Sequence, residues 1–273
     1  MDDATTHGMQ ACWVCGKETR NRCGGCGKAG IDIFFCSPEH QRFVWPIHKL
    51  FCGPGKANPF LLPPLSPDEA AEAKAHASDE YHDADMLIDP VDPLSLEKLL
   101  TRSGTIAKDK IGDLLDTFVS GNVPAVCDGR VNQLQLALIR LAEFYRLQQQ
   151  QTTRPKTMAK SPVHYALAQV CKMIVRDVGE LYSGYNVPIT DVPWLPHLLH
   201  RATFHFFVLA KGWEMPSKRN EAAEHYTCKR LEGVMKDEVE PDRPKVAELL
   251  FASLKWGTVE RAMFGMMGGV TFG

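Results

Sequence analysis

The chain has 273 residues, an apolar content near that of ordinary globular proteins and a formal net charge of -2. No uninterrupted apolar run approaches twenty residues, so the sequence predicts no membrane span and leaves room for one small and one medium domain. A net charge so close to zero also argues against a protein whose main task is to bind nucleic acid.

The first eight residues have no apolar signal core, so we predict a disordered tail over 1–8 and no export to an oxidising compartment. Eight potential metal ligands then lie within forty-one residues. They form two CxxC pairs and two pairs spaced four apart: Cys12/Cys15, Cys23/Cys26, Cys36/His40 and His48/Cys52. A CxxC turn presents two thiolates to one ion, and a four-residue step on a short helix puts both side chains on one face.

The pairing of these ligands follows from chain length. Only seven residues separate the two CxxC turns, a link too short to place both turns around one ion from opposite sides. Interleaving is therefore favoured. It predicts a first zinc held by Cys12, Cys15, Cys36 and His40, and a second zinc held by Cys23, Cys26, His48 and Cys52. Structural disulfides are the alternative, which an intracellular location disfavours.

The segment around the second pairs of ligands predicts a small α+β unit. Ser37-Pro38 is typical of a helix start, and we expect a short helix that Pro46 interrupts, followed by a second helical turn for His48 and Cys52. The alternating residues 31–35 predict one strand of a hairpin. So small a unit buries little apolar surface, and metal binding of about 10–16 kcal/mol per structural site would stabilise it.

These residues resemble a known family. Phe35-Cys36-Ser37, His40-Gln41, Trp45, His48-Lys49 and Cys52 are similar to the MYND-type zinc finger over residues 12–52. The chain departs from the family's usual pattern at His40, where Cys is common and zinc accepts either, and at Val44, where Asp or His is frequent.

The resemblance implies a protein interaction module that docks proline-rich peptides of PxLxP type. Gln41 and Trp45 match the positions that line the peptide groove, and the implied protein is an intracellular adaptor of the cytoplasm and/or nucleus. An indole offers a flat apolar platform to an extended proline-rich segment. The alternative is that Trp45 forms the small apolar centre of the finger and Gln41 is solvated.

Residues 57–93 read as an acidic, proline-rich linker that follows a finger over 9–56. Between residues 57 and 100 two Lys stand against ten Asp or Glu. Pro63, Leu65 and Pro67 spell PxLxP, which suggests intramolecular docking in the finger's own groove. The favoured alternative is that Ser66-Pro67-Asp68-Glu69 is a capping box that opens a helix through Ala77.

Residues 94–273 predict an all-α domain of unassigned role. Apolar residues recur at helical spacing in three segments, 111–118, 128–147 and 161–181. Further helices are predicted over 196–211, 218–236 and 243–255, the last two separated by Glu240-Pro241-Asp242. The predicted fold class is thus mainly α, with a small two-zinc α+β finger, an acidic linker and a helical domain.

No catalytic constellation stands out in the helical part. His197, His200 and His205 are predicted at the edge of an amphipathic helix. Cys127, Cys171 and Cys228 are isolated, and acidic residues such as Glu143, Asp177 and Glu180 lie on helix faces. We therefore expect no enzyme. The alternatives are a relative of SET-type lysine methyltransferases, although the Asn-His-Ser-Cys segment and β-rich region typical of them are missing, or a nucleic-acid-binding regulator.

Overall fold

The computed structural model describes residues 9–59, 61–81, 93–101, 106–120, 130–150, 161–175, 193–245 and 247–248. This part of the chain is mostly helical, and its one sheet is the antiparallel pair β1 (Gln10–Ala11) and β2 (Glu18–Thr19), with Gln10 opposite Thr19. The mainly α class predicted from the sequence is confirmed. None of the described helices is both long and apolar enough to cross a bilayer.

The described residues form two compact units. The first contains residues 9–59, 61–63, 161–167 and 193–234, and the second contains residues 64–81, 93–101, 106–120, 130–150, 168–175, 235–245 and 247–248. These units cross the division expected from the sequence, because the N-terminal finger packs with helices more than 140 residues further along the chain.

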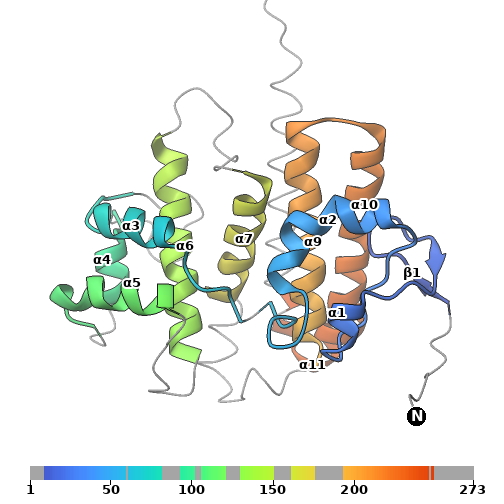
Figure 1. The fold of residues 1–273 in the computed structure, drawn as a ribbon, viewed down its shortest axis with the longest axis horizontal. Coiled ribbons are helices and arrows are strands. Elements are labelled where there is room, and N and C mark those ends of the chain that lie inside the picture. The colour runs from blue at the N-terminus through green and yellow to red at the C-terminus, as the bar shows by residue number, and fades with distance from the viewer. Residues whose placement is uncertain are drawn as a thin grey trace, which may run out of the picture. The chain divides into compact units, whose positions relative to one another are not determined.

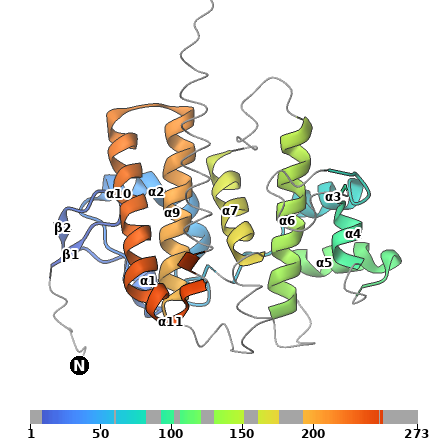
Figure 2. The same cartoon turned by 180° about the vertical axis from the view of Figure 1, so that it is seen from behind.

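In the first unit, the finger packs against a helical hairpin. The finger contains α1 (Gly24–Gly27), α2 (Pro38–His48) and the 3₁₀ turn η1 (Lys49–Phe51). The hairpin consists of α9 (Leu195–Glu214) and α10 (Lys218–Val234), which run side by side in Figures 1 and 2. Val44 and Ile47 of α2 are fully buried, and α2 contacts α9.

Helix α2 begins as predicted, but its end differs. The Ser37 hydroxyl accepts a hydrogen bond from the backbone N–H of His40 at 3.4 Å, and Pro38 occupies the first turn. The expectation that Pro46 interrupts the helix is wrong, since α2 continues to His48. A proline inside a helix removes only one backbone hydrogen bond, and the buried side chains on both sides of Pro46 hold the helix together.

The predicted strand over 31–35 is formed only in part. Phe34 makes an antiparallel bridge with Arg22, the Cys23 N–H donates to the Ile33 carbonyl at 2.7 Å, and the Phe35 N–H donates to the Asn21 carbonyl at 3.0 Å. The two strands of the finger's hairpin, β1 and β2, lie on either side of the first CxxC turn. Short runs with weak alternation do not specify a strand, because packing and not pattern decides where a ladder continues.

The second unit contains the segment expected to be a linker. Helix α3 (Pro67–Ala75) begins with the predicted capping box at Ser66 and Glu69, and buries Ala70 and Ala73. It contacts α5 (Ile111–Ser120) and α6 (Arg130–Gln150). Helix α4 (Leu96–Thr101) also contacts α6, and Figure 2 shows α3, α4 and α5 beside α6. This part of the acidic segment is therefore a packed element and not a free tether.

Several expectations extend beyond the described residues. These are the tail 1–8, linker residues 82–92, the helix starting at 128 and the region from 249 onward. Helix α7 (Pro162–Met173) starts at the predicted Ser161-Pro162, but its expected continuation to residue 181, with Asp177 and Glu180, lies outside the described part, as does Cys127.

Candidate metal centres

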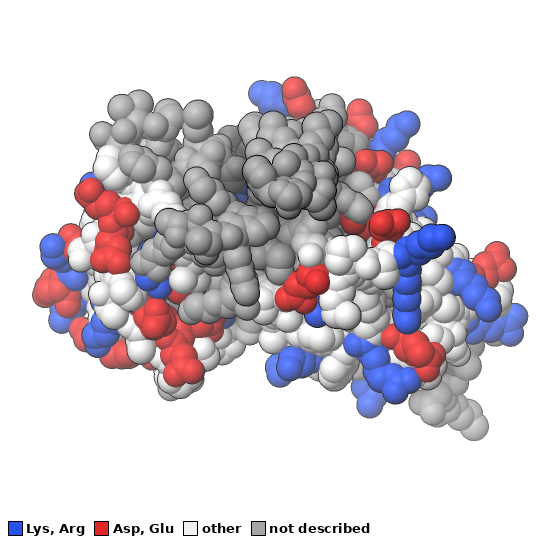
Figure 3. Space-filling view, turned by 90° about the horizontal axis from the view of Figure 1, so that it is seen from above, with Lys and Arg blue, Asp and Glu red and all other residues white. Residues whose placement is uncertain are grey.

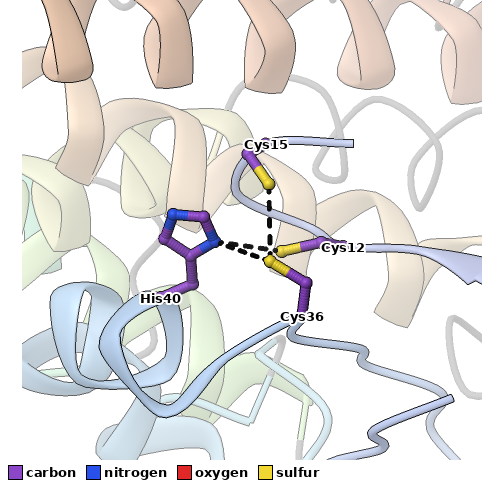
Figure 4. Close-up of side chains that lie close together, drawn as sticks. All are labelled: Cys12, Cys15, Cys36 and His40. Atoms are coloured by element: carbon purple, nitrogen blue, oxygen red, sulfur yellow. Dashed lines mark hydrogen bonds between the residues drawn. The ribbon is translucent and has the colours of Figure 1, made fainter. Parts of the chain in front are cut away.

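The first predicted ligand set comes together in the structure. Cys12, Cys15, Cys36 and His40 point toward one another (Figure 4), and their ligand atoms lie within 4.8 Å of each other. Cys15 Sγ is 3.6 Å from Cys36 Sγ, and His40 Nδ1 is 3.1 Å from Cys36 Sγ and 3.6 Å from Cys12 Sγ. The N-cap of α2 orients this group, because Ser37 directly follows Cys36 and starts the helix at Pro38, which turns His40 back toward the sulfurs.

The second predicted set comes together in the same way. Cys23, Cys26, His48 and Cys52 also lie within 4.8 Å of one another. His48 Nε2 is 3.4 Å from Cys23 Sγ and 3.7 Å from Cys26 Sγ, while Cys52 Sγ is 3.6 Å from Cys23 Sγ. His48 ends α2 and Cys52 follows η1, so the continuous helix carries one ligand of each set.

Apart from the shorter distance of 3.1 Å between His40 Nδ1 and Cys36 Sγ, these distances of 3.4–3.7 Å fit tetrahedral zinc. Ligands about 2.3 Å (sulfur) and about 2.1 Å (nitrogen) from one ion lie about 3.5–3.8 Å from each other. Each set has three sulfurs and one imidazole nitrogen, which is a common donor set of structural zinc sites. The two Cys₃His clusters therefore fit two zinc ions, and the interleaved grouping is the one that the sequence predicted.

The protonation chemistry of the second set agrees with this assignment. Hydrogen bonds from Cys26 and His48 lower the pKa of Cys23 to about 3, whereas the hydrogen bond to Cys23 and burial raise the pKa of Cys26 well above its usual range. Burial and the neighbouring thiol of Cys23 also raise the pKa of Cys52. Thiols so crowded do not all ionise on their own, and a divalent cation is what allows every one of them to be a thiolate.

The CxxC turns are tightened by backbone hydrogen bonds. The N–H of Gly16 donates to the carbonyl of Cys12 at 2.9 Å, and the N–H of Gly27 donates to that of Cys23 at 2.9 Å. Gly16 has φ +77, a left-handed conformation that suits glycine. Gly25 is required for another reason, because a Cβ there would lie 2.8 Å from Cys52 Sγ.

The two centres differ in how well the protein covers them. In the second set Cys23, Cys26 and His48 are buried, and the rings of Phe204, Phe35 and Trp45 lie 5.5, 5.7 and 5.8 Å from the His48 ring. In the first set only Cys12 is buried; Cys36 and His40 are half-buried, and Cys15 is exposed.

The two predicted groove residues lie one turn apart on α2. Trp45 is exposed, with 42% of its surface accessible, so it is not the buried centre of the finger. Gln41 is half-buried, and its Nε2 points at Cys23 Sγ from 4.0 Å. Trp45 is thus available at the surface, whereas the amide nitrogen of Gln41 faces the second centre.

Leu65 is buried within the second unit. It is 2% exposed, and its backbone N–H donates to the Phe118 carbonyl at 3.2 Å. Arg140 Nη2 donates to the Pro64 carbonyl at 3.0 Å, and Ser66 caps α3 ahead of Pro67. These contacts of Pro64, Leu65 and Ser66 lie within the second unit, and the docking of Pro63, Leu65 and Pro67 in the finger's own groove stays a prediction.

Sequence reasoning missed the surface that α9 and α10 offer to the finger. Trp13, between the first two ligands, packs edge-on against Phe204 at 5.8 Å, and the Arg201 guanidinium lies 3.9 Å from the centre of its ring. Tyr226 of α10 packs on Gly16. The aromatic run at 204–207 could have indicated this buried surface, because it is too apolar for a helix with one solvated face.

The histidines of α9 are not at its edge as predicted. His200 and His205 are buried, and only His197 is half-buried. His200 Nε2 donates to the Ala57 carbonyl at 2.5 Å, which ties α9 to the segment after the finger. Burial lowers the pKa of His200 to about 3 and that of His205 to about 4, so both are neutral at physiological pH.

Comparisons with known proteins agree with the metal centres. A family model described as "MYND finger" matches residues 12–52, which span all eight ligands. Egl nine homolog 1 of Mus musculus is 44% identical over 55 residues, which cover 20% of this chain and 13% of that protein. No solved structure matches the chain. Residues 12–52 are thus a MYND finger, which is a protein interaction module.

Proposed function

We propose that the MYND finger of residues 12–52 docks short proline-rich peptides of PxLxP type on the face of α2 that carries Trp45, and that the protein is an intracellular adaptor of the cytoplasm and/or nucleus without catalytic activity. The observation that carries the proposal is the exposure of Trp45, 42%, on a helix whose neighbouring residues Val44 and Ile47 are fully buried. Tryptophan is among the residue types that most often dominate the binding energy of a protein interface.

The metal centre supports Trp45 in this role. Its indole packs edge-on against the His48 ring at 5.8 Å, so a zinc ligand limits the freedom of the platform. An extended proline-rich segment loses little backbone entropy on binding, and its prolines stack on flat aromatic surfaces. Gln41 would contribute its amide oxygen to a peptide N–H, because its amide nitrogen already faces Cys23.

A peptide titration of the zinc-loaded full chain tests the proposal. Trp45→Ala should weaken binding of a fluorescent PxLxP peptide roughly tenfold or more, as expected for loss of an aromatic anchor. Met215→Ala is the matched control, since Met215 is 68% exposed in the same unit but lies far along the chain from the finger. Equal loss in both variants, or equal binding of a peptide whose leucine is replaced by alanine, would contradict the proposal.

The absence of catalysis is tested against the SET-type alternative. Among the described residues the only paired strands are β1 and β2 of the finger, which is unlike the β-rich region of that class. Isothermal titration with S-adenosylmethionine should give no heat of binding. Saturable binding would favour the methyltransferase alternative.

The nucleic-acid alternative is disfavoured by the charge distribution. Arg22 pairs with Asp32 and Arg42 with Glu39 in the finger, and Figure 3 shows basic side chains interspersed with acidic ones. Neutralising several phosphates makes affinity fall steeply with salt, whereas peptide docking changes little. We expect the peptide affinity to vary less than about threefold between 50 and 200 mM salt, in contrast to the steep loss of a phosphate contact surface.

A further inference from the structure

The first metal centre leaves part of its ligand set open to solvent. Cys15 is exposed, and Cys36 is half-buried. Their sulfurs lie 3.6 Å apart although the residues are 21 positions apart in the chain. A solvent-borne oxidant can therefore reach one thiolate while a second sulfur lies within bonding reach after a small movement.

The second centre has a similar sulfur pair but protects it. Cys23 and Cys52 are also 3.6 Å apart, and Cys52 is half-buried like Cys36; however, Cys23 is only 5% exposed, whereas Cys15 of the first pair is exposed. The backbone of Gly25 lies against Cys52, where a Cβ would come within 2.8 Å of its sulfur. Three rings cover His48. Chemistry that needs contact with solvent should therefore be slower at this centre.

We propose that the first centre is an oxidant-reactive site, at which a hydroperoxide converts Cys15 and Cys36 to a disulfide and releases one zinc ion while the second centre keeps its own. The Cys15 thiolate attacks hydrogen peroxide, which forms sulfenic acid and hydroxide. The Cys36 thiolate then attacks the Cys15 sulfur and expels a second hydroxide. The two thiolates together lose two electrons, and one hydrogen peroxide accepts them and becomes two hydroxide ions, which take protons from solvent.

The release of metal follows from the loss of donors. A disulfide sulfur is a poor zinc ligand, so Cys12 and His40 alone would remain at the first centre. Added reductant and zinc should restore the original state, because a disulfide is a reversible oxidation product. The inference does not rest on the proposed peptide docking, and its test contains no peptide.

The experiment uses the zinc-loaded full chain and dilute hydrogen peroxide, with a chromogenic chelator and native mass spectrometry as readouts. One zinc per chain should leave roughly tenfold faster than the other, and peptide mapping at that stage should find a Cys15–Cys36 disulfide. Simultaneous loss of both ions, first loss from the second centre, or a disulfide between other cysteines would overturn the proposal.

Two variants sharpen the test. Cys15→His keeps a zinc-binding side chain but removes the reactive sulfur, so the fast phase should slow roughly tenfold. Should Cys15→His fail to hold two ions, the disulfide map of the natural chain decides alone. Cys228→Ser is the matched control, because Cys228 lies outside both centres and its burial raises its pKa to about 11; zinc release should be unchanged.

Discussion

Gly16 shows at the scale of one residue how the finger and the helical hairpin fit together. It follows the first CxxC pair, has φ +77, and would bring a Cβ within 2.5 Å of the Tyr226 ring. Gly30 has nearly the same conformation, φ +78, with nothing within 4 Å of a Cβ. Comparing the two positions therefore distinguishes the cost of backbone strain, which both share, from the cost of a steric clash, which only Gly16 has.

Alanine at these two positions should therefore have different effects. Gly30→Ala should lower the free energy of unfolding by about 1 kcal/mol through strain alone, and Gly16→Ala by about 2–4 kcal/mol because the tyrosine ring must also move. Urea unfolding of the zinc-loaded chain measures both. Equal effects would mean that Tyr226 does not press on Gly16.

His205 links stability to pH at the same scale. It is buried, its Nδ1–H donates to the Thr227 hydroxyl at 3.3 Å, and Thr227 donates in turn to the Glu224 carbonyl. Burial lowers its pKa to about 4, below the value of about 6.5 expected in the unfolded chain. The unfolded state thus binds more protons between these values, so stability is present above pH 6.5 and is lost as pH falls.

We expect the titration of His205 to lower the free energy of unfolding by about 1 kcal/mol as the pH falls from 6.5 to 5.5. His205→Asn keeps a donor near the Nδ1 position but does not titrate, so the pH dependence should become shallower by that amount. Unfolding followed by circular dichroism, with zinc content checked at each pH, gives the comparison. Parallel curves for the two proteins would exclude this residue as a source of the pH dependence.

Helix α3 illustrates at the scale of an element how an apparently loose segment becomes packed. Its N-terminus is capped by Ser66, and Arg140 of α6 reaches it from the other side, with Nε 3.1 Å from Glu69 Oε1. The Arg140 side chain is 6% exposed. Although burial opposes ionisation of Glu69, the Arg140 charge and the hydrogen bonds of the capping box hold its pKa below the usual value.

Removing this arginine should therefore be costly. We expect Arg140→Ala to lower the free energy of unfolding by about 2–4 kcal/mol, because it leaves the Pro64 carbonyl and Glu69 without their buried partner. Lys74→Ala is the control, since Lys74 and Asp116 form an exposed pair at 3.7 Å that should contribute less than about 1 kcal/mol. If the two variants lost similar amounts of stability in thermal unfolding, the buried contacts of Arg140 would contribute no more than the exposed ion pair of Lys74.

At the scale of the whole molecule, zinc binding by the finger and packing of the finger on the α9–α10 hairpin depend on each other, because both occur in the first unit. The ring of the zinc ligand His48 lies 5.5 Å from Phe204 of α9, and the rings of Phe35 and Trp13 lie 6.2 and 5.8 Å from Phe204. Because this one side chain completes the apolar core of the finger, folding of the finger around zinc and docking on α9 support each other.

Phe204→Ala should then weaken zinc retention although it removes no ligand. We expect a loss of about 3–5 kcal/mol of stability and a faster transfer of zinc to a chelator. Phe118→Ala is a control of equal chemistry, because Phe118 is 1% exposed in the other compact unit. It should lower stability without changing the rate of zinc transfer, and an equal change in that rate would contradict the coupling.

The sequence by itself determined the features that depend on near neighbours. Ligand identity and grouping followed from the CxxC and four-residue spacings, and the starts of α2 and α3 followed from the caps at Ser37 and Ser66. These features are predictable because a cap or a metal-binding turn is completed by residues only a few positions away.

Only the tertiary structure decided how these parts are covered. It carried α2 through Pro46, buried His200 and His205, and placed Phe204 over the second centre. Each depends on contacts between residues far apart in the chain, and hydrophobic periodicity shows that a face is buried without showing what buries it. The ligands of a metal centre can be predicted from their spacing in the sequence. The apolar residues that cover the centre depend on packing between distant parts of the chain.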